Sequence, residues 1–135
     1  MTANEGWELL EVAVDSGATE TVVSENTLTS VAITDGPAKQ RGVMYEVADG
    51  TRIPNLGEKQ FQAQTEEGVI RKVTAQVCDV SKPLMSVHKM VKAGNWIVFD
   101  EEGSYVEDKA TGEVAWLEER GGMYMLKLWV KASGV

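Results

Sequence analysis

Short runs in which apolar and polar residues alternate make up most of the chain. Phe61 and Ala63, and farther on Val73, Ala75 and Val77, are each separated by one polar residue. A period of two residues indicates β-strands with one buried face. Apolar-rich or alternating runs predict strands over residues 7–14, 43–47, 51–56, 60–65, 69–80, 96–100, 105–108, 114–119 and 123–130.

Turn signals refine this pattern. Asp49-Gly50 lies between two extended runs and predicts a β-hairpin over residues 43–56, because glycine tolerates the positive φ that tight hairpin turns need. Pro54 lacks a backbone donor and indicates that the returning arm lies at an edge. The polar stretch 24–40, which contains Gly36-Pro37, predicts a long surface connection.

One short helix is predicted near residues 86–93. Ser86 can cap its start, and Val87, Met90 and Val91 have the spacing of one apolar helix face. Gly94 is suited to end it. The sequence therefore predicts an all-β fold with one helix.

With 135 residues the chain is long enough for one hydrophobic core, so residues 1–135 are expected to form a single domain. Its main part would span about residues 7–100, and the strands at about 105–130 would add to the sheet or to a dimer interface. Trp7, Trp96, Trp116 and Trp129 are expected in core or dimer packing.

Composition and charge exclude several function classes. Thirteen basic against twenty-one acidic residues give a net charge of −8, which argues against direct nucleic-acid binding. No apolar run approaches the roughly 18 residues of a membrane span, and the polar start of the chain does not resemble a signal peptide. One cysteine, Cys78, fits a reducing compartment. One histidine, His88, and one cysteine cannot build an ordinary zinc site, and no nucleotide-binding motif is present, so no metal and no cofactor are expected.

Asp15-Ser16-Gly17 is the most informative motif. It follows the apolar residues Val12-Ala13-Val14 and precedes Ala18-Thr19. An aspartate that acts on a peptide bond needs a fixed position, which the end of a strand provides, and the glycine allows a close backbone approach. A strand followed by an ordinary polar turn is the competing interpretation.

Hydrolysis of a peptide bond by aspartate side chains needs two carboxylates. One, ionised, takes a proton from the attacking water, and the other, protonated, hydrogen-bonds the scissile carbonyl oxygen. Two carboxylates about 3 Å apart cannot both ionise, so the pair shares one proton. The chain holds only one Asp-[Ser/Thr]-Gly, since Asp35-Gly36 and Asp49-Gly50 lack the middle hydroxyl residue. A second copy must supply the other aspartate across a twofold axis, which predicts a homodimer.

Residues 14–19 resemble the catalytic loop of retropepsins, the aspartic proteases of retroviruses and retrotransposons. Four further segments are similar, in the same order, to the copia-type branch of that family: 47–50, 83–90 followed by Ala93-Gly94, 98–100 and 122–126. The resemblance covers about residues 7–130. It implies a retropepsin-like domain, a closed or partly open barrel of strands, in which the hairpin 43–56 is a flap over the substrate.

The resemblance also implies roles for particular residues. The chain departs from many retropepsins by having Ser86 where they have glycine, and Thr19 and Val87 where they have an ion pair. The catalytic loop would consist of Asp15, Ser16 and Gly17. An extended polypeptide substrate would be bound by Ala18, Thr19, Glu20, Ala48, Asp49, Gly50, Thr51 and Leu84.

Two functions remain open at this point. The first is a homodimeric aspartic endopeptidase that cleaves a retroelement polyprotein, located in the cytoplasm, including within virus-like particles, with no direct nucleic-acid or membrane partner. The second is a protease-like dimer without effective catalysis that serves as a binding or assembly module.

Overall fold

The computed structural model describes residues 6–47 and 49–131, so Ala48, a predicted flap residue, lies outside the described part. Most of the described residues that are in regular elements are in strands, and the all-β prediction is confirmed. The elements in chain order are β1 Trp7–Asp15, β2 Val22–Val23, α1 Pro37–Gln40, β3 Met44–Glu46, β4 Arg52–Pro54, β5 Gly57–Gln64, β6 Ile70–Val77, β7 Leu84–Ser86, α2 Val87–Lys92, β8 Asn95–Val98, β9 Ser104–Asp108, β10 Val114–Arg120 and β11 Met123–Lys131.

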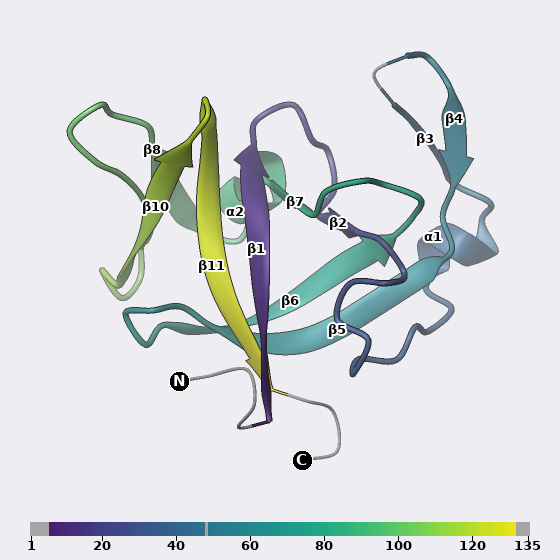
Figure 1. Cartoon of the computed structure of the whole chain (residues 1–135), viewed down its shortest axis with the longest axis horizontal. Helices are drawn as coiled ribbons and strands as arrows, with labels where there is room; N and C mark the ends of the chain where they lie inside the picture. Colours follow the sequence, from purple (N-terminus) through teal and green to yellow (C-terminus); the bar gives the residue numbers. More distant parts are fainter. Residues whose placement is uncertain (1–5, 48, 132–135) are drawn as a thin grey trace.

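The main sheet has nine strands in the order β1-β7-β2-β6-β5-β11-β10-β9-β8, and β1 also pairs with β11. This extra pairing returns the sheet from β11 to β1, so that part of the sheet closes on itself. The β1–β11 pair runs antiparallel from Trp7↔Lys131 to Ala13↔Met125. Figure 1 shows the two strands side by side, with β10 and β8 on the left.

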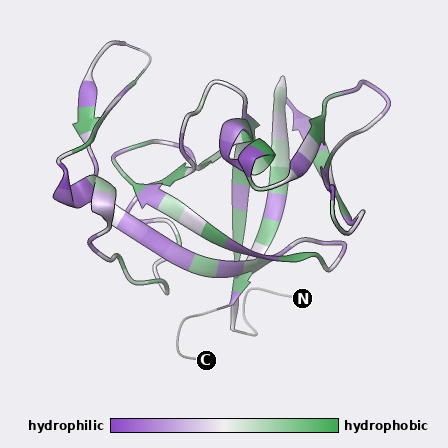
Figure 2. Cartoon of the chain, turned by 180° about the vertical axis from the view of Figure 1, so that it is seen from behind, coloured by the Kyte–Doolittle hydropathy of each residue, from purple (hydrophilic) through white to green (hydrophobic). Residues whose placement is uncertain are grey.

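The core lies inside the closed part of the sheet. Leu10, Val12 and Val14 of β1 point inward and are buried. Leu126, Leu128 and Val130 of β11, and Ala63, Ala75 and Val77 of β5 and β6, belong to the same buried cluster. Figure 2 shows hydrophilic and hydrophobic residues alternating along these strands, as half-buried strands require. The C-terminal strands are therefore part of the core as well as of the sheet.

The hairpin expected at residues 43–56 is present as β3 and β4, which form a separate two-stranded sheet. The backbone N–H of Val47 donates to the carbonyl of Thr51, and Gly50 has a φ of +86°. Pro54 lies in β4, which has β3 as its only strand partner among the described residues, as expected for an edge. In Figure 1 this hairpin projects from the body at the upper right.

The predicted helix is present as α2. The backbone N–H of Lys89 donates to the Ser86 side chain, which confirms the cap, and Gly94 has a φ of +94°. The expected apolar face is partly wrong, because Val91 is 50% exposed while Val87 and Met90 pack against the core. Within residues 6–47 and 49–131, no helix has both the length and the apolar character needed to cross a membrane.

Three short elements were not predicted. The connection 24–40 contains α1, so the expectation of one helix is wrong; Pro37 starts this helix at a position where a missing N–H is tolerated. β2 and β7 are two and three residues long and carry no alternating pattern. They matter because they link β1 to β6 through the pairs β1–β7, β7–β2 and β2–β6.

Two of the tryptophans do not pack in the core of the chain. Trp96 on β8 is 53% exposed and Trp116 on β10 is 56% exposed. The strand register places both on the same outer face as Tyr105 of β9. The rings of Tyr105 and Trp116 are in contact with centroids 5.2 Å apart, and the Lys109 ammonium lies 5.4 Å from the Trp96 ring centroid. We call this surface, made of Trp96, Tyr105 and Trp116, the aromatic face.

Replacing Gly57 by alanine is expected to destabilise the fold by about 2 kcal/mol. Gly57 has a φ of +131°, and a Cβ there would lie 2.6 Å from both the Ile33 Cγ2 atom and the Thr34 carbonyl oxygen. As a control, Gly112→Ala combines a φ of +75° with open space and should cost only about 1 kcal/mol. Urea unfolding measures both values, and equal losses would show that close packing at Gly57 is unimportant.

Candidate functional site

Asp15 ends β1 at the upper edge of the sheet in Figure 1. The three residues before it, Val12, Ala13 and Val14, are all buried, whereas Asp15 itself is partly exposed. The backbone N–H of Gly17 donates to the Asp15 Oδ1 atom over 2.7 Å. A Cβ at position 17 would lie 3.3 Å from that oxygen, so glycine allows this close approach. One carboxylate oxygen is thereby fixed, and the group remains accessible.

The loop after Asp15 is attached to the junction of β7 and α2. β1 and β7 pair in parallel with Ala13↔Leu84 and Asp15↔Ser86. The Ser86 hydroxyl donates to the Ala18 carbonyl over 2.7 Å, and the Ser86 N–H donates to the Thr21 Oγ1 atom over 3.1 Å. Ser86 has no exposed surface. The loop 15–21 is therefore held in its middle and at its end.

Glu20 connects this loop to two neighbours. Its carboxylate forms an ion pair with the Lys89 ammonium of α2, with the two groups 3.4 Å apart. Burial raises the pKa of the Tyr45 hydroxyl in β3, and the Glu20 carboxylate adds to this rise. Glu20 thus acts electrostatically on the base of the flap hairpin as well as on α2.

The β3–β4 hairpin is joined to the body through Asn55, which is buried. Its side-chain amide donates to the Tyr45 hydroxyl over 2.9 Å and to the Gln76 Oε1 atom over 2.8 Å, and its Oδ1 accepts the Gly57 N–H. At the other end, the backbone N–H of Thr51 donates to the Asp49 side chain over 2.9 Å. The hairpin is anchored at its base, and its tip stands apart from β1 in Figure 1.

The structure brings together some of the predicted site residues. Asp15, Ser16, Gly17, Ala18, Thr19 and Glu20 form one continuous loop, and Leu84 on β7 lies beside it through its pairing with Ala13. Asp49, Gly50 and Thr51 lie at the tip of the β3–β4 hairpin, which is separate from that loop in a single copy of the chain. Ala48 lies outside the described residues.

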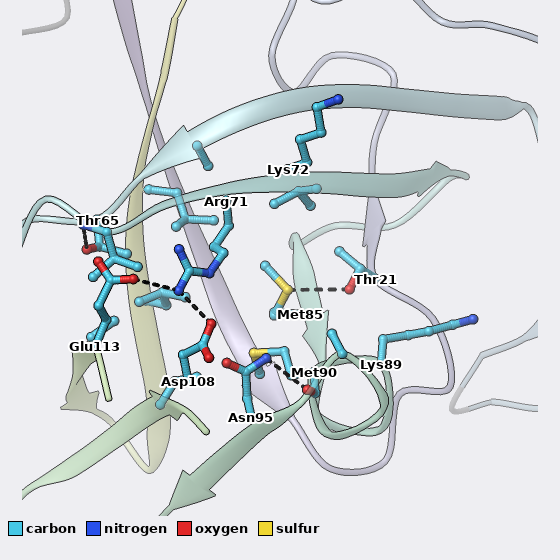
Figure 3. Close-up of a pocket in the computed structure, with 18 of the residues that line it drawn as sticks. Thr21, Thr65, Arg71, Lys72, Met85, Lys89, Met90, Asn95, Asp108 and Glu113 are labelled. Atoms are coloured by element: carbon cyan, nitrogen blue, oxygen red, sulfur yellow. Dashed lines mark hydrogen bonds and ion pairs between the residues drawn. The ribbon is translucent and has the colours of Figure 1, made fainter. Parts of the chain in front are cut away.

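A cavity lies elsewhere, between β6 and the α2, β8 and β9 region. It has a volume of about 240 Å³, and Asp15 lines neither it nor the smaller cavity beside Trp116. Figure 3 shows the Arg71 guanidinium at this cavity, paired with Asp108 at 2.6 Å and Glu113 at 3.0 Å. Thr21 and Met85, hydrogen-bonded to each other, lie at its opposite side. The cavity and the Asp15 loop thus share a wall.

Cys78 and His88 are the single cysteine and the single histidine of the chain. Cys78 is buried, and burial raises its pKa to about 11, so its thiol stays protonated near neutral pH. His88 lies on the exposed side of α2, as expected. Among residues 6–47 and 49–131, no group of three or more His, Cys, Asp or Glu side chains is arranged to hold a metal ion.

Two buried hydroxyl residues at the site were not recognised as such from the sequence. The sequence predicts Ser86 as a helix cap and predicts no role for Thr21. The sequence around the two positions gives no sign that their hydroxyls bind the same loop, because this depends on the β1–β7 pairing. Comparisons of this chain with family models, with curated proteins and with solved structures found no match.

Proposed function

We propose that the protein is an aspartic endopeptidase that acts as a homodimer and cleaves extended segments of a retroelement polyprotein. The observation that carries this proposal is the placement of Asp15 at the end of β1, with one carboxylate oxygen held by the Gly17 N–H and the group open to the outside. This is the arrangement that a hydrolytic carboxylate needs, because it must be fixed and must still meet water and substrate.

In the proposed reaction, the Asp15 carboxylates of two copies share one proton. The ionised carboxylate removes a proton from a water molecule as its oxygen attacks the scissile carbonyl carbon. The protonated one hydrogen-bonds the carbonyl oxygen as negative charge develops, and a proton then passes to the leaving amine. A site shared by two copies agrees with the fact that Asp15 lines neither of the two cavities described above.

The β8 strand and the aromatic face support pairing on that side of the chain. β8 is last in the strand order, so among the described residues one of its edges has no strand partner. Phe99, just after β8, contacts Tyr124 with ring centroids 4.8 Å apart, and the next residue, Met125, pairs with Ala13. The end of β8 is therefore close to the Asp15 end of β1. Pairing across β8 would bring two Asp15 loops toward each other.

Replacing Trp96 by glutamate is therefore expected to weaken self-association by at least about 30-fold in Kd, because a charge would replace a large ring at the interface. Ile70→Glu is the matched control, since Ile70 is 47% exposed on β6 and should leave association unchanged. Sedimentation across a concentration series measures both. Equal association of the two variants would contradict the proposed pairing surface.

Proteolysis itself is tested with a fluorogenic peptide library at several pH values. We expect cleavage at mildly acidic pH, inhibited by a peptide that carries statine, whose hydroxyl imitates the tetrahedral intermediate. A stable dimer that cleaves no peptide and binds no statine peptide would contradict the enzyme and favour the binding or assembly module. Cleavage that is insensitive to statine would also contradict the proposed mechanism.

A further inference from the structure

The junction of β7 and α2 holds a hydroxyl group that no solvent reaches. The Ser86 side chain is completely buried and lies beside Asp15 in the parallel β1–β7 pair. We infer that Ser86, together with Thr21, is a positioning residue that fixes the orientation of the Asp15 loop. The expected effect of Ser86 on the rate of peptide cleavage rests on the proposed function. Its expected effect on the position of loop 15–21 does not.

The direction of the hydrogen bonds follows from the donors available. The Lys89 backbone N–H donates to the Ser86 Oγ atom over 3.1 Å, so the oxygen accepts there. The one hydroxyl proton is thus free to donate to the Ala18 carbonyl, 2.7 Å away. A single side chain therefore caps α2 and binds the middle of the Asp15 loop.

Thr21 completes this arrangement at the end of the loop. Its Oγ1 atom accepts the Ser86 N–H over 3.1 Å and donates to the Met85 Sδ atom over 3.4 Å. Thr21 is 5% exposed, so these bonds form away from competing water. The loop is held by β7 at two points, Ala18 and Thr21, on either side of the partly exposed residues between them.

This attachment is expected to matter for catalysis more than for folding. A reacting carboxylate that moves by about 1 Å can lose about a hundredfold in rate, whereas the loss of one hydrogen bond changes the stability of the fold only modestly. The Ser86 hydroxyl does not touch the proposed substrate position. It acts through the Ala18 carbonyl, and its removal leaves the Asp15 carboxylate and the Gly17 N–H chemically intact.

Two variants separate the loop bond from the helix cap. Ser86→Ala and Ser86→Gly both remove the bond to Ala18, but glycine at a helix N-cap is nearly as good as serine, whereas alanine is not. We expect both variants to lower kcat about tenfold with KM within about twofold, and only Ser86→Ala to lose appreciable thermal stability. If kcat instead follows stability, falling in Ser86→Ala alone, the positioning role is wrong.

Ser104→Ala is the matched control. Ser104 is also buried, and its hydroxyl accepts the Asp100 N–H and donates to the Asp100 carbonyl instead of bonding to the Asp15 loop. This variant should lose stability and keep the kcat of the wild-type protein. A fall in kcat equal to that of the Ser86 variants would show that any buried serine has the same effect, which overturns the inference.

A second readout does not depend on proteolysis. The Gly17 amide proton is hydrogen-bonded to the Asp15 carboxylate. Its hydrogen-exchange rate, measured by NMR, should rise at least about tenfold in both Ser86 variants and stay unchanged in Ser104→Ala. Unchanged exchange in the Ser86 variants would overturn the inference even if cleavage is observed. Faster exchange in a protein that never cleaves peptides would support the positioning of the loop and contradict the proposed function alone.

Discussion

Replacing Asp15 by asparagine is expected to lower peptide cleavage by at least about a thousandfold while leaving fold and dimer intact. The amide has the same shape, and its oxygen can still accept the Gly17 N–H, so the loop keeps its geometry. It cannot take a proton from water, so the chemical step loses its base. Initial rates with a cleaved peptide, together with circular dichroism and sedimentation, measure both parts of this prediction.

Asp35→Asn is the matched control. Asp35 also precedes a glycine, but it is exposed and its carboxylate pairs with the Lys39 ammonium at 2.7 Å. Its replacement should leave cleavage within about twofold of the wild-type rate. If both variants keep their activity, Asp15 is not the catalytic carboxylate.

Mixing wild-type and Asp15→Asn protein tests whether two copies share the site. If subunits exchange freely and each active site needs two aspartates, activity follows the square of the wild-type fraction. An equimolar mixture would then keep about a quarter of the activity. A linear fall to about half would show that each chain works alone, and the dimeric mechanism would be wrong.

Replacing Lys59 by methionine is expected to destabilise the fold by at least about 3 kcal/mol. Lys59 is 1% exposed, and its ammonium donates to the carbonyl oxygens of Glu25, Thr27 and Leu28. Burial lowers its pKa, and these carbonyl groups offset the loss of water around the charge. Methionine keeps much of the volume but leaves the Glu25 and Thr27 carbonyl groups without the ammonium donor, at about 1–3 kcal/mol each when buried, while the Leu28 carbonyl keeps its bond from the Val31 N–H.

Leu28 makes this loss larger. It is buried and has a φ of +56°, a conformation that L-residues with large side chains rarely adopt. The Lys59 bond to its carbonyl, at 2.9 Å, helps to hold that conformation. Lys72→Met, on the exposed side of neighbouring β6, should change the free energy of unfolding by less than about 0.5 kcal/mol. Equal stability of the two variants in urea unfolding would show that water replaces the ammonium of Lys59 without cost.

The strands that could be predicted from the sequence are those with several alternating residues. Phe61, Ala63, Ala75 and Val77 are buried as their period indicates, and both arms of the 43–56 hairpin are present. β2 and β7 are too short to show a period, so their pairing with β1 and β6 depends on contacts distant in sequence. The parallel β1–β7 pair, which determines what surrounds Asp15, belongs to this class.

Residue type alone also gives wrong predictions of burial where a polar group has hydrogen-bond partners inside the folded chain. A lysine such as Lys59 is expected at the surface, because only a specific set of acceptors allows its burial. Conversely, Trp96 and Trp116 are large apolar residues with more than half of their surface exposed. The loop 15–20 could be predicted from Asp15-Ser16-Gly17, whereas its attachment to Ser86 and Thr21 could not.

The pairing of Trp7 with Lys131 brings the first and last residues of the β1–β11 ladder to one place. That place is separated from Asp15 by the length of β1, roughly 26 Å at the usual rise per strand residue. Sequences fused before and after these strands would emerge next to each other and far from the Asp15 carboxylate. A mechanical pull on such flanks would open the ladder like a zipper, one residue pair after another, instead of loading all its hydrogen bonds at once.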